Sequence, residues 1–114
     1  MTNLLSDDQR ALLQAHGRTS AENPRHDPAP VVKLFTPHAG ATWLLSELDA
    51  GGAIAFGLCD LGVGCPELGY VSLLELEGLR GPWGLAIERD LHFVANKPLS
   101  GYAREARLGG RIVT

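Results

Sequence analysis

The sequence has few cysteines, few aromatic residues and no long apolar run. Its 114 residues include only Cys59 and Cys65, too few for a scaffold held together by disulfides. The longest apolar runs are a few residues, such as 53–56, whereas a membrane-spanning helix needs roughly 20. Asp7 and Asp8 stand where a secretory signal carries positive charge. We therefore expect a cytoplasmic protein with no part in a membrane.

Charge is distributed unevenly along the chain, because residues 1–96 carry 6 basic and 12 acidic side chains. The net charge is −3, and the apolar fraction of 45% with a charged fraction of 20% is ordinary for a folded domain. This composition excludes a mainly disordered chain. Residues 97–114 differ, because they hold four basic side chains against one acidic side chain. The basic end is the one electrostatic feature that points to a partner.

The chain divides into a helix, a polar linker and one domain. Ser6 and Gln9 have the spacing of a capping box, which predicts a helix over residues 1–17 that stops at Gly17. Residues 18–30 are polar, contain three prolines and predict a linker. The first helix either docks on the domain or stays tethered. Residues 31–114 are expected to form a single α+β domain.

The domain is predicted to be a small sheet covered by helices. Capping and stop signals predict one helix from Ser72 to about Arg80 and another from near Pro98 to Leu108. Short turns such as Asp49–Gly52 favour antiparallel pairing. We predict an α+β fold with a mostly antiparallel sheet of about five strands, two helices covering one face, and the N-terminal helix. The predicted strands are residues 31–36, 42–48, 53–60, 70–71 and 85–93, and the predicted core aromatics are Phe35, Trp43, Phe56, Tyr70 and Phe93.

Several segments of the domain resemble a known family. They are PVVKLFTPHAGATWLLSELD at 30–49, AIAFGLCDLGVGCPELGYVSLLELEGLRG at 53–81, and GLAIERDLHF with KPLS within 84–100. Together they resemble a family of short bacterial proteins that is classified as a domain of unknown function. That family is common on proteobacterial plasmids and other mobile elements. The resemblance covers about residues 30–108, and it implies a role in plasmid or anti-defence biology without assigning catalytic residues.

The sequence departs from the family pattern at a few positions. The turn at Asp49–Gly52 is shorter and richer in glycine than is usual in the family, Leu74 replaces a small polar residue, and Ala86 replaces a proline. These positions lie in turns and at helix edges. The departures therefore leave the expected fold unchanged.

The segment ERDLH is the main candidate for catalytic chemistry. In an extended strand Glu88, Asp90 and His92 lie on one face, where two carboxylates and an imidazole suit a divalent metal or acid–base catalysis. The same alternation also describes the solvated face of a half-buried strand. We favour the solvated face and therefore expect neither a catalytic residue nor a cofactor.

Arg89 lies on the apolar face of the same predicted strand. A buried guanidinium needs a partner, and Glu67 or Glu47 would supply a carboxylate. A clamp for an anion is the alternative interpretation.

The cysteines offer a weaker alternative. Cys59 and Cys65 with His38 or His92 would make a zinc site, but five residues separate the cysteines, more than the usual two to four, and no second pair exists. No local signature marks either cysteine as a nucleophile. Both are better explained as packing residues.

Two surface features are candidate binding sites. Arg104, Arg107 and Arg111 have the spacing of one helical face, with Lys97 nearby, and such a face suits phosphates. Trp83 follows Gly81 and Pro82 in a turn, where an exposed indole would anchor a protein partner.

These observations favour a small non-enzymatic binding module that acts on a protein partner in mobile-element biology. Two alternatives stay open. One is a nucleic-acid-associated accessory protein that uses the C-terminal basic face, and the other is a metal-dependent hydrolase at Glu88, Asp90 and His92.

Overall fold

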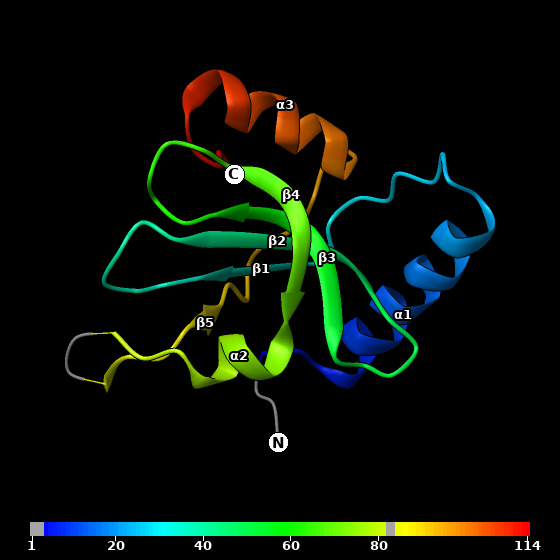
Figure 1. Ribbon diagram of the computed structural model, residues 1–114, viewed down its shortest axis with the longest axis horizontal. Helices are drawn as coiled ribbons and strands as arrows, with labels where there is room; N and C mark the ends of the chain where they lie inside the picture. Colours follow the sequence, from blue (N-terminus) through cyan, green and yellow to red (C-terminus); the bar gives the residue numbers. More distant parts are fainter. Residues whose placement is uncertain (1–3, 82–83) are drawn as a thin grey trace.

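The computed structural model describes residues 4–81 and 84–114, which form a five-stranded antiparallel sheet flanked by helices (Figure 1). The strand order is β4-β3-β2-β1-β5, so the α+β prediction is confirmed. Among the described residues, no helix is both long and apolar enough to cross a bilayer. Trp83 lies outside the described residues. The elements are α1 Asp7–Glu22, β1 Val32–Phe35, β2 Thr42–Leu48, β3 Ile54–Asp60, β4 Glu67–Ser72, α2 Leu73–Gly78, β5 Glu88–Arg89 and α3 Leu99–Gly109.

Each face of the sheet carries its own hydrophobic core. On one face, α1 and α2 pack Leu13 and Leu76 into a cluster with Trp43. On the other face, α3 packs Tyr102 into a cluster with Leu44. Trp43 and Leu44 are neighbours in β2 and point to opposite faces, so this apolar strand needs cover on both. The predicted placement of both later helices on one face is therefore wrong.

The turn between β2 and β3 forms as the sequence predicts. Asp49 Oδ1 accepts hydrogen bonds from the N–H groups of Ala53 at 2.8 Å and Ile54 at 3.1 Å. The donors from Ile54 and Ala53 hold the pKa of the Asp49 carboxyl below its ordinary value. Gly52 has a φ of 76°, in the left-handed region that favours glycine. The side chain and the glycine together fix where the chain reverses.

Helix α1 begins where predicted and ends later. Ser6 Oγ accepts the Gln9 N–H at 3.1 Å, and Gln9 Oε1 accepts the Ser6 N–H at 3.0 Å, which confirms the capping box. The helix continues to Glu22, so the predicted stop at Gly17 is wrong. It docks on the sheet, because Arg10 Nη1 donates to the Gly52 carbonyl at 3.1 Å.

Gly17 is a close-approach residue rather than a helix stop. A Cβ at Gly17 would lie 2.4 Å from the carbonyl oxygen of Leu48 in β2. Only a residue without a side chain lets α1 lie this near the strand. The glycine therefore sets the distance between α1 and β2.

Replacing Gly17 by alanine is expected to destabilise the protein. Alanine is the better helix former by about 1 kcal/mol, but overpacking against β2 costs roughly 1–3 kcal/mol. Urea unfolding followed by circular dichroism measures the difference. Gly109→Ala is the control, because an added Cβ there meets nothing within 4 Å. Equal stability of Gly17→Ala and the parent protein would contradict this account of α1.

The last strand is much shorter than predicted. Sequence alternation predicts a strand over residues 85–93, yet only Glu88–Arg89 pairs with β1. Asp90 Oδ1 accepts the backbone N–H of His92 at 2.8 Å, and this Asx turn bends the chain away. Leu91 is consequently exposed instead of packed.

β4 is longer than predicted, and its aromatic residue lies outside the core. The strand spans Glu67–Ser72, whereas the predicted strand covers only residues 70–71. Tyr70 is 76% exposed, so its predicted place in the core is wrong, whereas Trp43 is buried as expected. β4 is an edge strand, so no further strand covers Tyr70 from the side.

Candidate functional site

Asp90 and His92 line a polar cleft of about 350 Å³ beside α3 and the C-terminal residues. Glu88 does not line this cleft. It lies in β5, whereas Asp90 and His92 follow the end of that strand. Lys33 Nζ lies 3.7 Å from Asp90 Oδ2 and also donates to Thr114 Oγ1 at 2.6 Å. Within residues 4–81 and 84–114, no three His, Cys, Asp or Glu side chains are grouped to hold a metal ion. The predicted triplet is therefore not assembled.

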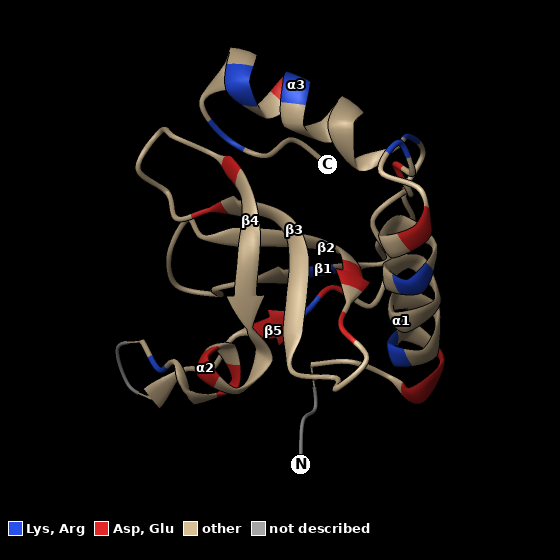
Figure 2. Ribbon diagram, turned by 45° about the vertical axis from the view of Figure 1, so that its right-hand side comes forward, with Lys and Arg blue, Asp and Glu red and all other residues tan. Residues whose placement is uncertain are grey.

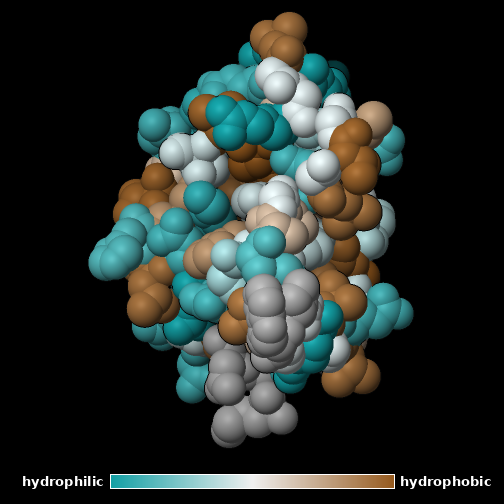
Figure 3. Space-filling model, turned by 90° about the vertical axis from the view of Figure 1, so that its left-hand side faces the viewer, coloured by the Kyte–Doolittle hydropathy of each residue, from teal (hydrophilic) through white to brown (hydrophobic). Residues whose placement is uncertain are grey.

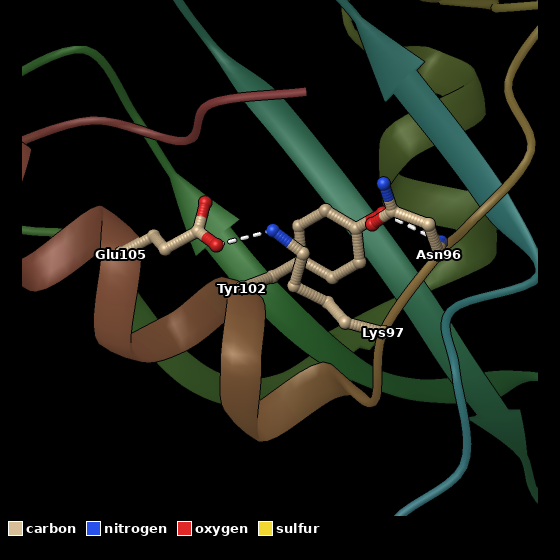
Figure 4. A network of polar contacts seen from close by, with 4 residues as sticks. All are labelled: Asn96, Lys97, Tyr102 and Glu105. Carbon is tan, nitrogen blue, oxygen red and sulfur yellow. Dashed lines mark hydrogen bonds and ion pairs between the residues drawn. The ribbon is translucent and has the colours of Figure 1, made fainter.

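One wall of this polar cleft is a network at the start of α3 (Figure 4). Lys97 forms an ion pair with Glu105, and its Nζ lies 4.8 Å from the centroid of the Tyr102 ring. Tyr102 Oη accepts the Asn96 N–H at 3.1 Å and donates to Asn96 Oδ1 at 3.2 Å. These contacts fix the chain entering α3. They also occupy Lys97, which is then a poor phosphate ligand.

The predicted basic face is only partly formed. Arg104 and Arg107 lie on α3 and are exposed (Figure 2). Gly110 adopts a φ of 76° and ends the helix, so Arg111 lies beyond it and does not share its face. Neither Arg104 nor Arg107 has an ion-pair partner in the described part of the chain. The face of α3 therefore carries two of the three arginines that the spacing predicts.

Arg89 has a polar partner, but not a predicted one. Its Nη1 donates to Gln9 Oε1 at 3.2 Å, the oxygen that also caps α1. Glu67 lies in β4 at the opposite edge of the sheet, and Glu47 accepts from Ser20 instead. Arg89 thus joins β5 to the start of α1, which is a structural role.

The cysteines do not form a site with a histidine. Cys59 is half-buried, and its burial raises the pKa of the thiol, which disfavours the reactive thiolate. Cys65 is exposed in the loop before β4. The ring of His38 lies against the backbone of Gly81, within the space that a Cβ there would occupy. The packing explanation fits the half-buried Cys59 but not Cys65, which is exposed.

A mostly apolar groove that the sequence did not indicate lies beside α1. It has a volume of about 440 Å³, and its lining is mostly apolar. One wall is the second half of α1, the floor is the end of β2 with its turn, and the other wall is β3 and β4. The lining residues used below are Gly17, Ala21, Glu47, Ile54, Phe56 and Tyr70.

Two aromatic rings form the β-strand wall of the groove. Phe56 in β3 and Tyr70 in β4 are direct cross-strand partners, with ring centroids 5.0 Å apart. They lie on the face that α3 covers further along, but α3 does not reach Tyr70, which stays exposed. The sequence signal was present as an aromatic residue in a short strand. The exposure of Tyr70 depends on the strand order, which could not be predicted from the sequence.

A polar cluster borders the groove and resembles a catalytic arrangement only superficially. Ser20 Oγ donates to Glu47 Oε2 at 2.7 Å and lies 3.0 Å from His26 Nδ1. Because the hydroxyl proton is directed at Glu47, His26 Nδ1–H donates to Ser20 rather than accepting its proton. A nucleophilic serine needs the opposite direction. The cluster instead ties the segment after α1 to β2.

The fold and its open surfaces define a small α+β protein with an apolar groove and, among its described residues, no assembled metal site. The chain belongs to the family described as Protein of unknown function (DUF2958), whose model matches residues 4–113. This match extends beyond the region of resemblance and includes α1. Comparison with curated proteins finds no match, and comparison with solved structures finds none either.

Proposed function

We propose that this protein is a non-enzymatic binding module that holds an extended, apolar segment of a protein partner in the groove between α1 and β3–β4. The observation that carries the proposal is Tyr70, an aromatic side chain that is 76% exposed beside a mostly apolar groove. Exposed aromatic side chains in a concave surface are typical anchors of protein interfaces. The setting in mobile-element biology is supported by the family resemblance.

The shape of the groove favours a chain segment over a small molecule. Its walls are the second half of α1 and strands β3 and β4, so the groove is bordered by two elements and is open to solvent. Phe56 and Tyr70 offer a ring surface to an apolar side chain of that segment. The carboxylate of Glu47 is already hydrogen-bonded by Ser20. Arg18 and Asp49 are the other charged residues of the lining.

The polar cleft near Asp90 supports an enzyme less well. Lys33 neutralises Asp90, and Lys97 is occupied by Glu105. The exposed His92 ring makes no side-chain hydrogen bond or ion pair in the part of the chain described. The groove is therefore the better candidate site.

A blocked groove is expected to lose peptide binding. Ala21 lines the groove and is exposed, so Ala21→Arg fills the channel without disturbing the core. A phage-displayed library of unstructured peptides is selected on the wild-type protein, and an enriched peptide is then titrated against the variants. We expect at least a tenfold weaker dissociation constant for Ala21→Arg, equal to about 1.4 kcal/mol.

Ala11→Arg is the matched control, because Ala11 is exposed on the same helix and does not line the groove. It adds the same charge and the same side chain, so it should leave the affinity unchanged. Equal affinities for both variants, or a library that yields no binder, would remove the groove as the binding site.

A further inference from the structure

The outer edge of β4 carries backbone groups without a partner. Leu73 N–H donates to the Ala53 carbonyl at 3.0 Å. This bond identifies Ala53 and Leu73 as a hydrogen-bonded pair, and hydrogen-bonded pairs then alternate along the β3–β4 ladder. Alternation along this ladder directs the N–H and C=O groups of Gly69 and Val71 towards β3. The corresponding groups of Leu68 and Tyr70 point away from the sheet.

Nothing in the described structure covers this edge. The strand order ends at β4, and in Figure 2 no helix or strand lies beside it on the side away from β3. Figure 3 shows hydrophobic side chains in several patches among hydrophilic ones, so apolar surface is not confined to the groove. On β4 itself, Leu68 is 39% exposed and Tyr70 is 76% exposed.

β4 also lacks the features that protect edge strands. Natural edges avoid pairing through lysine, proline, bulges or very short length. β4 has six residues, no lysine, no proline and only Glu67 as a charged residue. The opposite edge, β5, is protected in this sense, since it has two residues and both are charged.

We propose that β4 pairs antiparallel with β4 of a second copy of this chain, around a two-fold axis at Gly69. In this register Leu68 and the partner subunit's Tyr70 exchange both of their outward hydrogen bonds, and the symmetric pair does the same. Gly69 then faces the partner subunit's Gly69 in the close, non-hydrogen-bonded position. A Cβ at Gly69 would meet nothing within 4 Å, so nothing in the protomer obstructs this approach.

The register is self-complementary in side chains as well as in the backbone. Leu68 lies opposite the partner subunit's Tyr70, an aliphatic–aromatic pair that stabilises antiparallel strands. Glu67 lies opposite the partner subunit's Val71, so the two glutamates do not face each other. The result is one continuous sheet across both copies, with the two grooves on the same face. The partner subunit's Leu68 would extend the wall that Tyr70 forms.

Charge pairs at positions 68 and 70 test both the dimer and its register. We expect the mass of the wild-type chain in sedimentation velocity to rise with concentration towards twice 12.2 kDa. Leu68→Lys with Tyr70→Lys places like charges opposite each other and should weaken the dimer at least about tenfold. Leu68→Lys with Tyr70→Glu places opposite charges together in this register and should restore it.

Leu74→Lys is the control, because Leu74 is 79% exposed on α2 and lies outside β4. Circular dichroism checks that each variant remains folded. A wild-type chain that is monomeric at every concentration would overturn the dimer. A Lys/Glu variant as weak as the Lys/Lys variant would overturn the register.

A disulfide provides a second, independent measurement. Gly69→Cys in a Cys65→Ser background is expected to form a covalent dimer on mild oxidation, since the two Cβ atoms would be near each other across the axis. Absence of that covalent dimer would contradict the proposed axis. None of these variants lies in α1, so failure of the dimer and failure of the groove in Ala21→Arg are distinguishable.

Discussion

Replacing Gly57 by alanine is expected to destabilise the protein strongly. Gly57 is buried in β3 opposite Leu45, next to an irregularity in the β2–β3 register. A Cβ there would lie 2.0 Å from the Leu44 carbonyl oxygen and 2.9 Å from the Leu45 Cα. Both obstructing atoms are backbone at the centre of the sheet, so neither yields without breaking the ladder. We expect a loss of at least about 3 kcal/mol, against a total stability of about 5–15 kcal/mol.

The matched control is the directly paired glycine on the next strand. Gly69 lies opposite Gly57 in the β3–β4 ladder, and a Cβ there has open space. Gly69→Ala should therefore change the free energy of unfolding by less than about 1 kcal/mol. Urea denaturation at low protein concentration compares the two variants. A similar loss of unfolding free energy in both variants would show that the close contact between β2 and β3 is not the reason for a glycine at position 57.

The second large effect is expected for Trp43. Its side chain is 3% exposed, and it lies in the core that α1 and α2 cover. Truncation to alanine leaves a cavity and typically costs about 3–5 kcal/mol, a large part of the stability of a domain this size. Thermal unfolding should show the loss as a large drop in Tm.

Trp43→Phe keeps most of the ring volume and should recover much of that loss. A Trp43→Ala protein that unfolds at the parent temperature would contradict the burial of the indole. The result also matters for function, because loss of binding in Trp43→Ala reports unfolding and not a site. Surface variants such as Ala21→Arg avoid this ambiguity.

The central strands were predictable because local signals agreed with tertiary packing. β2 and β3 match the predicted segments closely, since apolar runs flank a turn that Asp49 and Gly52 specify. The last strand failed for a physical reason. The alternation of polar and apolar residues continues past Arg89, but the Asp90 side chain accepts a hydrogen bond from the His92 N–H. The resulting turn ends the pairing of β5 with β1.

Two features depend on contacts between distant segments and were not predictable. Gly17 has the pattern of a helix stop, and its role becomes visible only once Leu48 lies against it. The groove likewise requires α1, β3 and β4 to be placed in space. Tyr70 illustrates the same limit, since an aromatic residue in a strand predicts burial only when another element covers it.

The most direct test of the groove as the binding surface is a ¹H–¹⁵N NMR titration of the full chain with a peptide enriched on the wild-type protein. The account predicts that amide shift changes concentrate in the second half of α1, around Gly17 and Ala21, and in β3 and β4 around Phe56 and Tyr70. Changes centred on α3, or on the polar cleft at Asp90 and His92, would contradict it and place the binding site away from the groove.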